Sequence, residues 1–328
     1  MSPEVSNVDV GHCAPVVLIG YRRPVHTRRV FEAIRQAQAP VLFVVMDGPK
    51  ASEPRDSALV AETRAIVEMV DWDCEVHRVY ADTNMGLKER VSTGLDRVFE
   101  SVEAAIILED DCLPSPSFFR FASQLIQRFG NDPRVGMIGG SQRVGRKFPG
   151  GHSYAFSRDV RIWGWATWAR TWKAFRDSGD LEMSWTEQES EELASLFASG
   201  PRRRSMTSMM ARSEALDSWA LPFAVHCARS GYLNPVPAQN LVQNIGLGES
   251  STHTTFENYV VDVRSSELVF PLIHPESVSY SYPVDELESL RDQIEFFLYP
   301  LRHPIDTLRR IFRFVLLKKV PKVTRESL

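Results

Sequence analysis

The sequence has no excess of basic residues, no paired cysteine motif and no long apolar run. Its 38 lysines and arginines against 42 aspartates and glutamates give a formal net charge of −4, which argues against bulk nucleic-acid binding. Cys13, Cys74, Cys112 and Cys227 lie far apart without a CxxC pair, so neither a disulfide framework nor a zinc knuckle is expected. The sequence contains no stretch of about 18 apolar residues, which is the length that spans a bilayer. Residues 1–14 lack the basic start and apolar run of a signal peptide. We therefore expect a soluble, cytoplasmic protein with no nucleic-acid partner.

Glycine motifs that bind phosphates are also missing. No GxGxxG and no GxxxxGK[ST] follows any apolar run, which argues against Rossmann dinucleotide binding and against a P-loop. The sequence contains no internal repeat and no low-complexity segment. With 328 residues, 43% of them hydrophobic and 24% charged, the chain has room for one large α/β domain plus an appendage.

The first half of the sequence alternates short β-rich runs with helical patterns. Runs typical of buried strands are Val16–Gly20, Val41–Met46, Glu75–Tyr80 and Ala104–Leu108. Apolar residues recur at helical spacing over His26–Gln36, Ser57–Met69 and Leu87–Phe99. This alternation predicts a doubly wound, mostly parallel α/β sheet with right-handed crossovers. Because ligands bind such sheets outside the carboxyl ends of the strands, the residues that follow the strands are the site candidates.

The second half is less regular. We expect a helix over Phe118–Phe129, a strand over Val135–Ile138, an acidic helix over 182–199, a basic turn over 201–204, a helix over Leu216–Arg229 and a flexible loop over 246–255. The stretch from Arg302 to Lys322 mixes basic with apolar residues, as an interfacial amphipathic helix does. The expected organisation is a flexible N-terminus over 1–13, one domain over 14–284 with halves 14–115 and 116–284, and a C-terminal helical tail over 285–328.

Three consecutive carboxylates, Glu109, Asp110 and Asp111, follow the apolar run AAIIL. Half-buried acids are costly unless a cation or hydrogen bonds compensate them. Mg²⁺ and Mn²⁺ take one or two carboxylates together with phosphate oxygens and water. A metal site is therefore one interpretation of the triplet, and a solvated acidic turn or helix N-terminus is the other.

Two other strand ends carry polar residues. Asp47 precedes Gly48-Pro49 and is either a turn residue or a carboxylate that accepts hydrogen bonds from a base or a ribose. Arg22 and Arg23 follow the first strand. They are either surface arginines or guanidinium groups that meet a diphosphate.

Three features of the second half admit both a structural and a functional interpretation. The tryptophans of the segment 162–172 belong either to the core or to a platform for a sugar ring. Asp217 lies in an apolar context and is either a helix N-cap or a general base whose pKa is raised by burial. The loop histidine His253 is either exposed or packed in the core, or it contacts a metal or a phosphate.

Taken in order, these features resemble the GT-A glycosyltransferase fold over about residues 14–256. They are most similar to bacterial family-2-like transferases and to the N-acetylglucosaminyltransferase I group. Ala104–Asp111 with Pro116–Phe119 is similar to that group's apolar strand, Glu-Asp-Asp and Pro-x-Phe-Phe. Gly164-Trp165 resembles the acceptor-side loop, and Asp217-x-Trp219 resembles the element that bears the base. Gln243–Gly246 with Thr252–Thr254 resembles the closing loop.

The resemblance implies a role for each matching residue. Asp111 would bind Mn²⁺ or Mg²⁺, and His253 would close over the metal or the diphosphate. Asp110 would hold the ribose, Glu109 a donor-sugar hydroxyl, and Asp47 would read the base. Asp217 would be the catalytic base, although the related pattern has a second acid where this chain has Ser218. The remaining residues placed at the donor are Tyr21, Arg22, Arg23, Lys88 and Trp165.

The implied activity is metal-dependent, inverting transfer of a hexosyl or N-acetylhexosaminyl group. The expected donor is a nucleotide-diphosphate sugar, with UDP as the nucleotide, and the acceptor a glycan or a lipid-linked saccharide in polysaccharide assembly. The basic tail would touch the inner face of the cell membrane. A nucleotidyltransferase is the enzymatic alternative, but it normally carries a glycine-rich loop where this chain has Gly20-Tyr21-Arg22-Arg23-Pro24. A sugar-binding module without catalysis is the other alternative.

Overall fold

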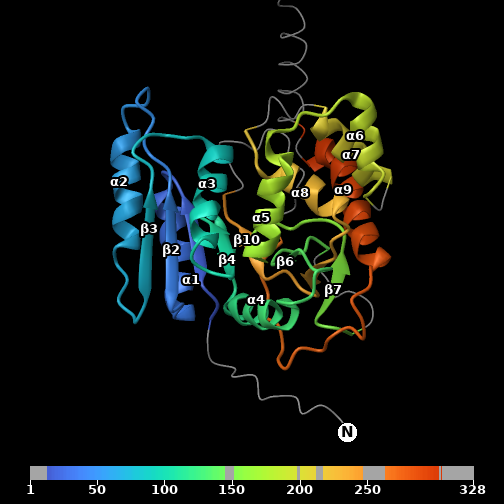
Figure 1. Cartoon of the computed structure of the whole chain (residues 1–328), viewed down its shortest axis with the longest axis horizontal. Helices are drawn as coiled ribbons and strands as arrows, with labels where there is room; N and C mark the ends of the chain where they lie inside the picture. The colour runs from blue at the N-terminus through green and yellow to red at the C-terminus, as the bar shows by residue number, and fades with distance from the viewer. Residues whose placement is uncertain are drawn as a thin grey trace, which may run out of the picture.

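The computed structural model describes residues 13–144, 151–197, 200–211, 217–246, 263–302 and 304. A six-stranded sheet in the order β3-β2-β1-β4-β8-β6 forms its centre (Figure 1). Four strands are parallel to one another: β1 (Val16–Gly20), β2 (Val41–Met46), β3 (Glu75–Tyr80) and β4 (Ala104–Glu109). β8 (Trp165–Trp168) runs antiparallel to both β4 and β6 (Met137–Gly139). The prediction of a doubly wound, mostly parallel α/β sheet is confirmed.

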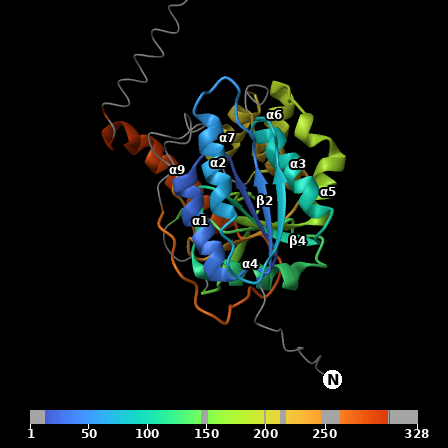
Figure 2. The same ribbon diagram turned by 90° about the vertical axis from the view of Figure 1, so that its left-hand side faces the viewer.

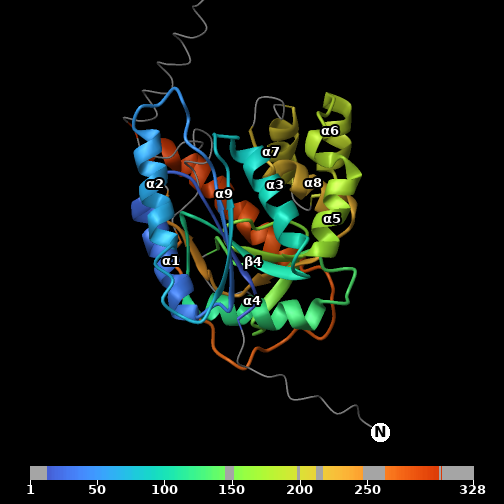
Figure 3. The same cartoon turned by 60° about the vertical axis from the view of Figure 1, so that its left-hand side comes forward.

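Helices cover both faces of this sheet (Figures 2 and 3). One face packs on α1 (Pro24–Ala37), α2 (Asp56–Val67) and α4 (Pro116–Phe129). The other face packs on α3 (Leu87–Phe99), α5 (Ala169–Ser178) and α8 (Ala220–Arg229). The result is a sheet buried between two layers of helices.

The sequence of β1 shows why both faces need cover. Side chains alternate across a strand, so Val16 and Leu18 face the α1 side while Val17 and Ile19 face the α3 side. All of these side chains are buried. A strand with two buried faces reads as a continuous apolar run, which is how β1, β2 and β4 appear in the sequence.

Smaller elements surround the sheet. Two antiparallel ribbons pair β5 (Cys112–Pro114) with β10 (Val242–Asn244) and β7 (Tyr154–Ser157) with β9 (Asn234–Pro237). A short 3₁₀ helix, Asp180–Glu182, follows α5. α6 (Glu187–Ala194) and α7 (Gly200–Met210) build a satellite core with α8. α6 begins at a capping box, in which Thr186 and Glu189 bond each other's backbone N–H groups.

Most element boundaries expected in the second half shift in the structure. The acidic helix is shorter than expected and ends at Ala194. The helix expected from Leu216 begins at Ala220, and the strand expected over Val135–Ile138 occupies Met137–Gly139. The basic turn at 201–204 is wrong, because these residues lie within α7. Proline is compatible with the first turn of a helix, which is where Pro201 lies in α7.

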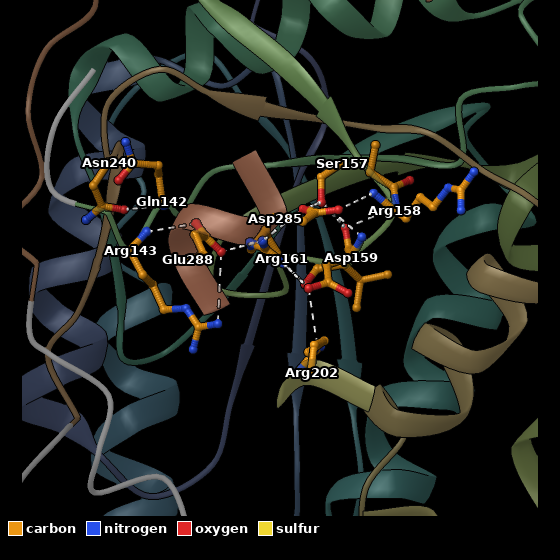
Figure 4. A network of polar contacts seen from close by, with 12 residues as sticks. Gln142, Arg143, Ser157, Arg158, Asp159, Arg161, Arg202, Asn240, Asp285 and Glu288 are labelled. Atoms are coloured by element: carbon orange, nitrogen blue, oxygen red, sulfur yellow. Dashed lines mark hydrogen bonds and ion pairs between the residues drawn. The ribbon is translucent and has the colours of Figure 1, made fainter. Parts of the chain in front are cut away.

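The C-terminal helix α9 (Tyr282–Arg302) is anchored in the body of the protein. Its Asp285 and Glu288 are buried and form ion pairs with Arg161. Figure 4 shows this group of charges, which also includes Asp159 and Arg202. The domain boundary expected at residue 285 therefore cuts through a helix whose first turns belong to the fold. Among the residues described, no helix is both long and apolar enough to cross a membrane.

Candidate functional site

The strand order places a topological switch point between β1 and β4. From β1 the chain proceeds through α1 and α2 to β2 and β3 on one side, and α3 then carries it across to β4 on the other. The two strands are in register up to Ile19 opposite Glu109, so their carboxyl ends lie next to each other. Crevices at such switch points bind ligands in open α/β sheets. The residues after β1 and after β4 therefore form the candidate site.

Arg23 and the acidic triplet meet at this point. Glu109 is the last residue of β4 and is half-buried, while Asp110 is buried. Arg23 Nη1 lies 2.7 Å from Asp111 Oδ2 and 3.7 Å from Asp110 Oδ1. The backbone N–H of Tyr21 donates to Asp110 Oδ2 at 3.3 Å. The loop after β1 thus supplies one guanidinium and one amide to two adjacent carboxylates.

The charge on this acidic pair is only partly compensated. Burial raises the pKa of Asp110 to about 7, and the neighbouring Asp111 adds to that rise. Arg23 and the Tyr21 amide act in the opposite direction without overcoming it. Two carboxylates that share a site cannot both ionise easily unless more positive charge is supplied. The pair is therefore suited to an additional cation.

The donor set fits a hard divalent cation that keeps most of its own ligands. Asp110 and Asp111 offer carboxylate oxygens, which Mg²⁺ and Mn²⁺ prefer, and these ions often take only one or two from a protein. In the part of the chain that the structure describes, no three His, Cys, Asp or Glu side chains are grouped to hold a metal ion. His253, the other predicted metal ligand, lies outside the described residues. Phosphate oxygens and water would have to complete the coordination.

A second chain segment closes on the acidic pair from β10. Ile245 donates its backbone N–H to the carbonyl oxygen of Asp111 at 2.8 Å. A Cβ on Gly246 would lie 2.3 Å from Asp111 Oδ2, so only glycine allows this approach. The expected resemblance of Gln243–Gly246 to a closing loop thus falls on residues that contact the candidate metal ligand. The remainder of that predicted loop, 247–255, lies outside the described residues.

Asp47 is a buried acceptor at the end of β2. Its Oδ1 accepts the backbone N–H of Gly48 at 2.8 Å and of Met85 at 2.9 Å, and its Oδ2 accepts Nδ2 of Asn84 at 2.7 Å. Asp47 therefore joins the loop after β2 to the loop after β3. This confirms a turn-stabilising role, and a lone pair on Oδ2 is still available for a ligand.

The side chains of Tyr21 and Arg22 are bound by Asp56, a residue that the sequence analysis missed. Asp56, the fully buried first residue of α2, accepts hydrogen bonds from the Tyr21 hydroxyl and from Arg22. It also accepts the backbone N–H of Lys50 at 2.8 Å. These three donors outweigh burial and hold the pKa of Asp56 below its usual value. In the sequence Asp56 reads only as an acid near a helix start, which gives no sign of these distant partners.

Asp217 and Lys88 meet at the start of α3. Asp217 is exposed, and its two carboxylate oxygens accept the backbone N–H groups of Leu87 at 2.8 Å and Lys88 at 3.0 Å. Asp217 therefore caps a helix, as one interpretation held, but the helix is α3 and not its own. The side chain of Lys88 pairs with Glu182 at 2.8 Å. Within the described part of the chain, the partners of these two charged groups are therefore the α3 amides and Glu182, and not the acidic pair.

Trp165 is a core residue, so the donor-contacting role expected for it is corrected. Its side chain is fully buried and stacks on Trp219 with ring centroids 5.3 Å apart. Trp168 and Trp172 are also buried. Short tryptophan spacing cannot distinguish core from platform, because the strand β8 and the helix α5 that follows turn these rings inward.

Comparisons with known proteins give only distant likenesses. No family model matches the sequence, and no curated protein matches it. Among solved structures, an apo UDP-glucose pyrophosphorylase is 11% identical, with 70% of this chain and 93% of that chain covered and a TM-score of 0.37. The 4-diphosphocytidyl-2C-methyl-D-erythritol synthase from Anaerococcus prevotii is 8% identical, with 53% and 79% covered and a TM-score of 0.34. HddC from Yersinia pseudotuberculosis is 7% identical, with 48% and 77% covered and a TM-score of 0.30. At these TM-scores the comparisons carry no argument, and conclusions about function rest on the site itself.

Proposed function

We propose that the protein is a metal-dependent glycosyltransferase that uses a nucleotide-diphosphate sugar, with UDP as the nucleotide. One observation carries the proposal: two adjacent carboxylates, the buried Asp110 and the half-buried Asp111, share the single guanidinium of Arg23 at the switch point of a doubly wound sheet. A divalent cation with an anionic diphosphate would supply the missing positive charge and a ligand at once. The order of motifs, which resembles the GT-A transferases, supports a sugar as the transferred group.

The residues around the switch point divide the work of binding the donor. Asp111, with Asp110 beside it, would hold Mn²⁺ or Mg²⁺, which when bound would stabilise negative charge on the leaving diphosphate. Asp47 would accept a hydrogen bond from the base. Glu109 would bind a hydroxyl of the donor sugar, and Arg22 and Tyr21 would face the ribose or phosphate side. The acceptor is proposed to be a glycan or a lipid-linked saccharide.

The reaction would be a single displacement with inversion. The acceptor hydroxyl oxygen forms a bond to C1 of the sugar while the bond from C1 to the diphosphate oxygen breaks. The hydroxyl proton passes to a carboxylate base, for which Asp217 is the proposed residue. Each Asp217 oxygen accepts one backbone N–H, from Leu87 or from Lys88, and a carboxylate oxygen has a second lone pair that could take the proton.

Two variants test the division between donor and acceptor sides. Asp111→Asn should lose most Mn²⁺-dependent UDP affinity, because it removes a charge from the proposed metal ligands. Asp217→Asn should retain that affinity and lose about 10²–10⁴-fold in turnover, because an amide cannot accept the proton. Titration calorimetry with UDP and Mn²⁺, paired with turnover on a panel of nucleotide sugars, measures both. Wild-type turnover in Asp217→Asn would move the base elsewhere, and full activity in EDTA would remove the metal from the proposal.

A second assay distinguishes the proposed glycosyltransferase from the enzymatic alternative, a nucleotidyltransferase. A nucleotidyltransferase would form a nucleotide sugar from a nucleoside triphosphate and a sugar 1-phosphate, with release of pyrophosphate. We expect no pyrophosphate release from any of UTP, GTP, dTTP or CTP with hexose 1-phosphates. Release of pyrophosphate at a rate above sugar transfer would replace the glycosyltransferase proposal.

Contact of the C-terminal region with an anionic membrane is part of the proposal. α9 exposes Leu290, Ile294 and Leu301. Ile294 and Leu301 follow Leu290 by four and eleven residues, which puts all three on one helix face. The sequence beyond α9 adds Arg309, Arg310, Arg313, Lys318 and Lys319, and such basic residues are drawn to anionic lipid. Flotation with anionic liposomes should recover the full chain and not a chain that ends before Arg302. Equal flotation of the two chains would contradict the contact.

A further inference from the structure

Arg23 occupies the position that a divalent cation would need. Its Nη1 is 2.7 Å from Asp111 Oδ2 and 3.7 Å from Asp110 Oδ1. Mg²⁺ would bind a carboxylate oxygen at about 2.0–2.1 Å. A guanidinium and a divalent cation against the same oxygen would repel each other strongly at this depth, because neither is well screened by water. Both cannot hold Asp111 in this geometry together.

The neighbouring arginine does not share this conflict. Arg22 is bonded to Asp56, and Asp56 is anchored in turn by the Lys50 amide. Arg23 lies just before α1, and about a quarter of its side chain is exposed, against one sixth of that of Asp111. The Arg23 guanidinium can therefore reorient toward solvent without unpacking the core.

We propose that Arg23 is an exchangeable counter-ion. It neutralises Asp111 before the cation binds, is displaced from Asp111 by the cation, and then binds the anionic diphosphate that the cation accompanies. This inference rests on the proposed function. A guanidinium fork suits phosphate oxygens as well as it suits a carboxylate. Arg23 therefore has an anionic partner both before the cation binds and after it. The consequence is that Mn²⁺ alone binds weakly, and nucleotide and metal bind tightly only together.

The test measures Mn²⁺ binding to the full chain without nucleotide, by the electron paramagnetic resonance signal of free Mn²⁺. Arg23→Gln should bind Mn²⁺ alone about tenfold more tightly than wild type, because the competing charge is gone. In saturating Mn²⁺ the same variant should bind UDP about tenfold more weakly, because the diphosphate loses a guanidinium. An opposite change in two affinities is not expected from general damage to the fold.

Arg28→Gln is the matched control, since it removes the same charge from an exposed position of α1. It should change neither affinity by more than about twofold, given screening at the surface. Unchanged or weaker binding of Mn²⁺ alone to Arg23→Gln, with wild type still binding UDP and Mn²⁺ together, would overturn the exchange and leave the proposed function standing. If wild type binds UDP equally well in Mn²⁺ and in EDTA, both the exchange and the proposed function are contradicted.

A measurement on wild type covers the case in which Arg23→Gln does not fold. The side-chain Nε–H signal of Arg23 can be assigned by its absence from the spectrum of Arg23→Lys. In wild type this signal should shift when Mg²⁺ is added, and shift again when UDP follows. A signal that stays in place while Mg²⁺ saturates the protein would overturn the exchange.

Discussion

Two clusters of buried charge in this protein differ in their balance. Around Arg161, the acids Asp159, Asp285 and Glu288 are matched by Arg161, Arg202 and Arg143 (Figure 4). Arg202 lies 3.1 Å from Asp159 and Arg143 lies 4.0 Å from Glu288. At the end of β4, Asp110 and Asp111 share only Arg23. Within the residues that the structure describes, neither acid of this pair has a further ion pair. The first cluster has as many cations as anions, and the second has one cation fewer than anions.

This difference separates a structural cluster from a ligand-binding one. The Arg161 cluster joins segments that are far apart in sequence, because it connects the loop after β6, the segment between β7 and β8, α7 and α9. Backbone amides complete it: Arg143 donates its N–H to Glu288 Oε1 at 3.0 Å, and Arg158 to Asp285 Oδ2 at 3.1 Å. Among the described residues, the donors that the acidic pair has besides Arg23 are the Tyr21 amide and, at 3.6 Å from Asp111 Oδ1, the Cys112 thiol. A buried acidic site left short of cations by the fold is one that a bound cation can complete.

Breaking the balanced cluster should produce the largest loss of stability. Arg161→Met leaves Asp285 and Glu288 buried without their central partner, and removal of one member of a buried ion pair costs about 3–5 kcal/mol. Urea denaturation at pH 7.5 measures the change in the free energy of unfolding. Arg158→Gln is the matched control, because Arg158 is exposed and rests on the Tyr280 ring, and it should cost under about 1 kcal/mol. Equal effects of the two substitutions would contradict the structural role of the cluster.

The pH dependence of stability should reveal an asymmetry within the balanced cluster. Burial and the charge of Asp159 raise the pKa of Asp285 to about 6, well above the ordinary value of an aspartate. A raised folded pKa contributes stability below the unfolded pKa, and this contribution is lost as the pH rises through about 6. Asp285→Asn should therefore match wild type near pH 4 and exceed it by about 1–3 kcal/mol at pH 7.5.

Asp159 provides the opposite case for the same denaturation series. Although burial alone would raise its pKa, Arg202 and Arg161 outweigh burial and lower it. Its contribution is present above the unfolded pKa and lost as the pH falls through the lower folded value. Asp159→Asn should therefore lose stability at pH 7.5. Stabilisation by Asp159→Asn, or destabilisation by Asp285→Asn, would contradict this assignment of the two acids.

Substitution in the acidic pair should have the smallest effect on folding. Asp111→Asn removes one of two like charges and leaves Asp110 near Arg23, so we expect a change within about 1 kcal/mol, in the range of substitutions outside the core. The same denaturation measurement applies. A loss above about 3 kcal/mol would mean that the pair holds the fold together as the Arg161 cluster does.

The central fold could be predicted closely because its signals are local. β1, β2, β3 and α3 occupy the expected residues, and β4 is longer by Glu109. The second half resisted prediction, since its short strands pair with distant segments. β8, for example, inserts between β4 and β6, and its tryptophans gave no sign of the sheet that buries them.

The candidate site divides in the same way. The sequence by itself placed Arg23, Asp47 and the acidic triplet at strand ends, because alternation of strands and helices puts the carboxyl ends of parallel strands at one edge of the sheet. It could not show that Asp56 holds Tyr21 and Arg22, or that Asp217 caps α3 from a distance of 130 residues in the chain. Side-chain contacts of that kind depend on packing between elements, which periodicity does not encode. The charge imbalance that marks the site was likewise decided only by the tertiary structure, which brought one arginine, and not two, to Asp110 and Asp111.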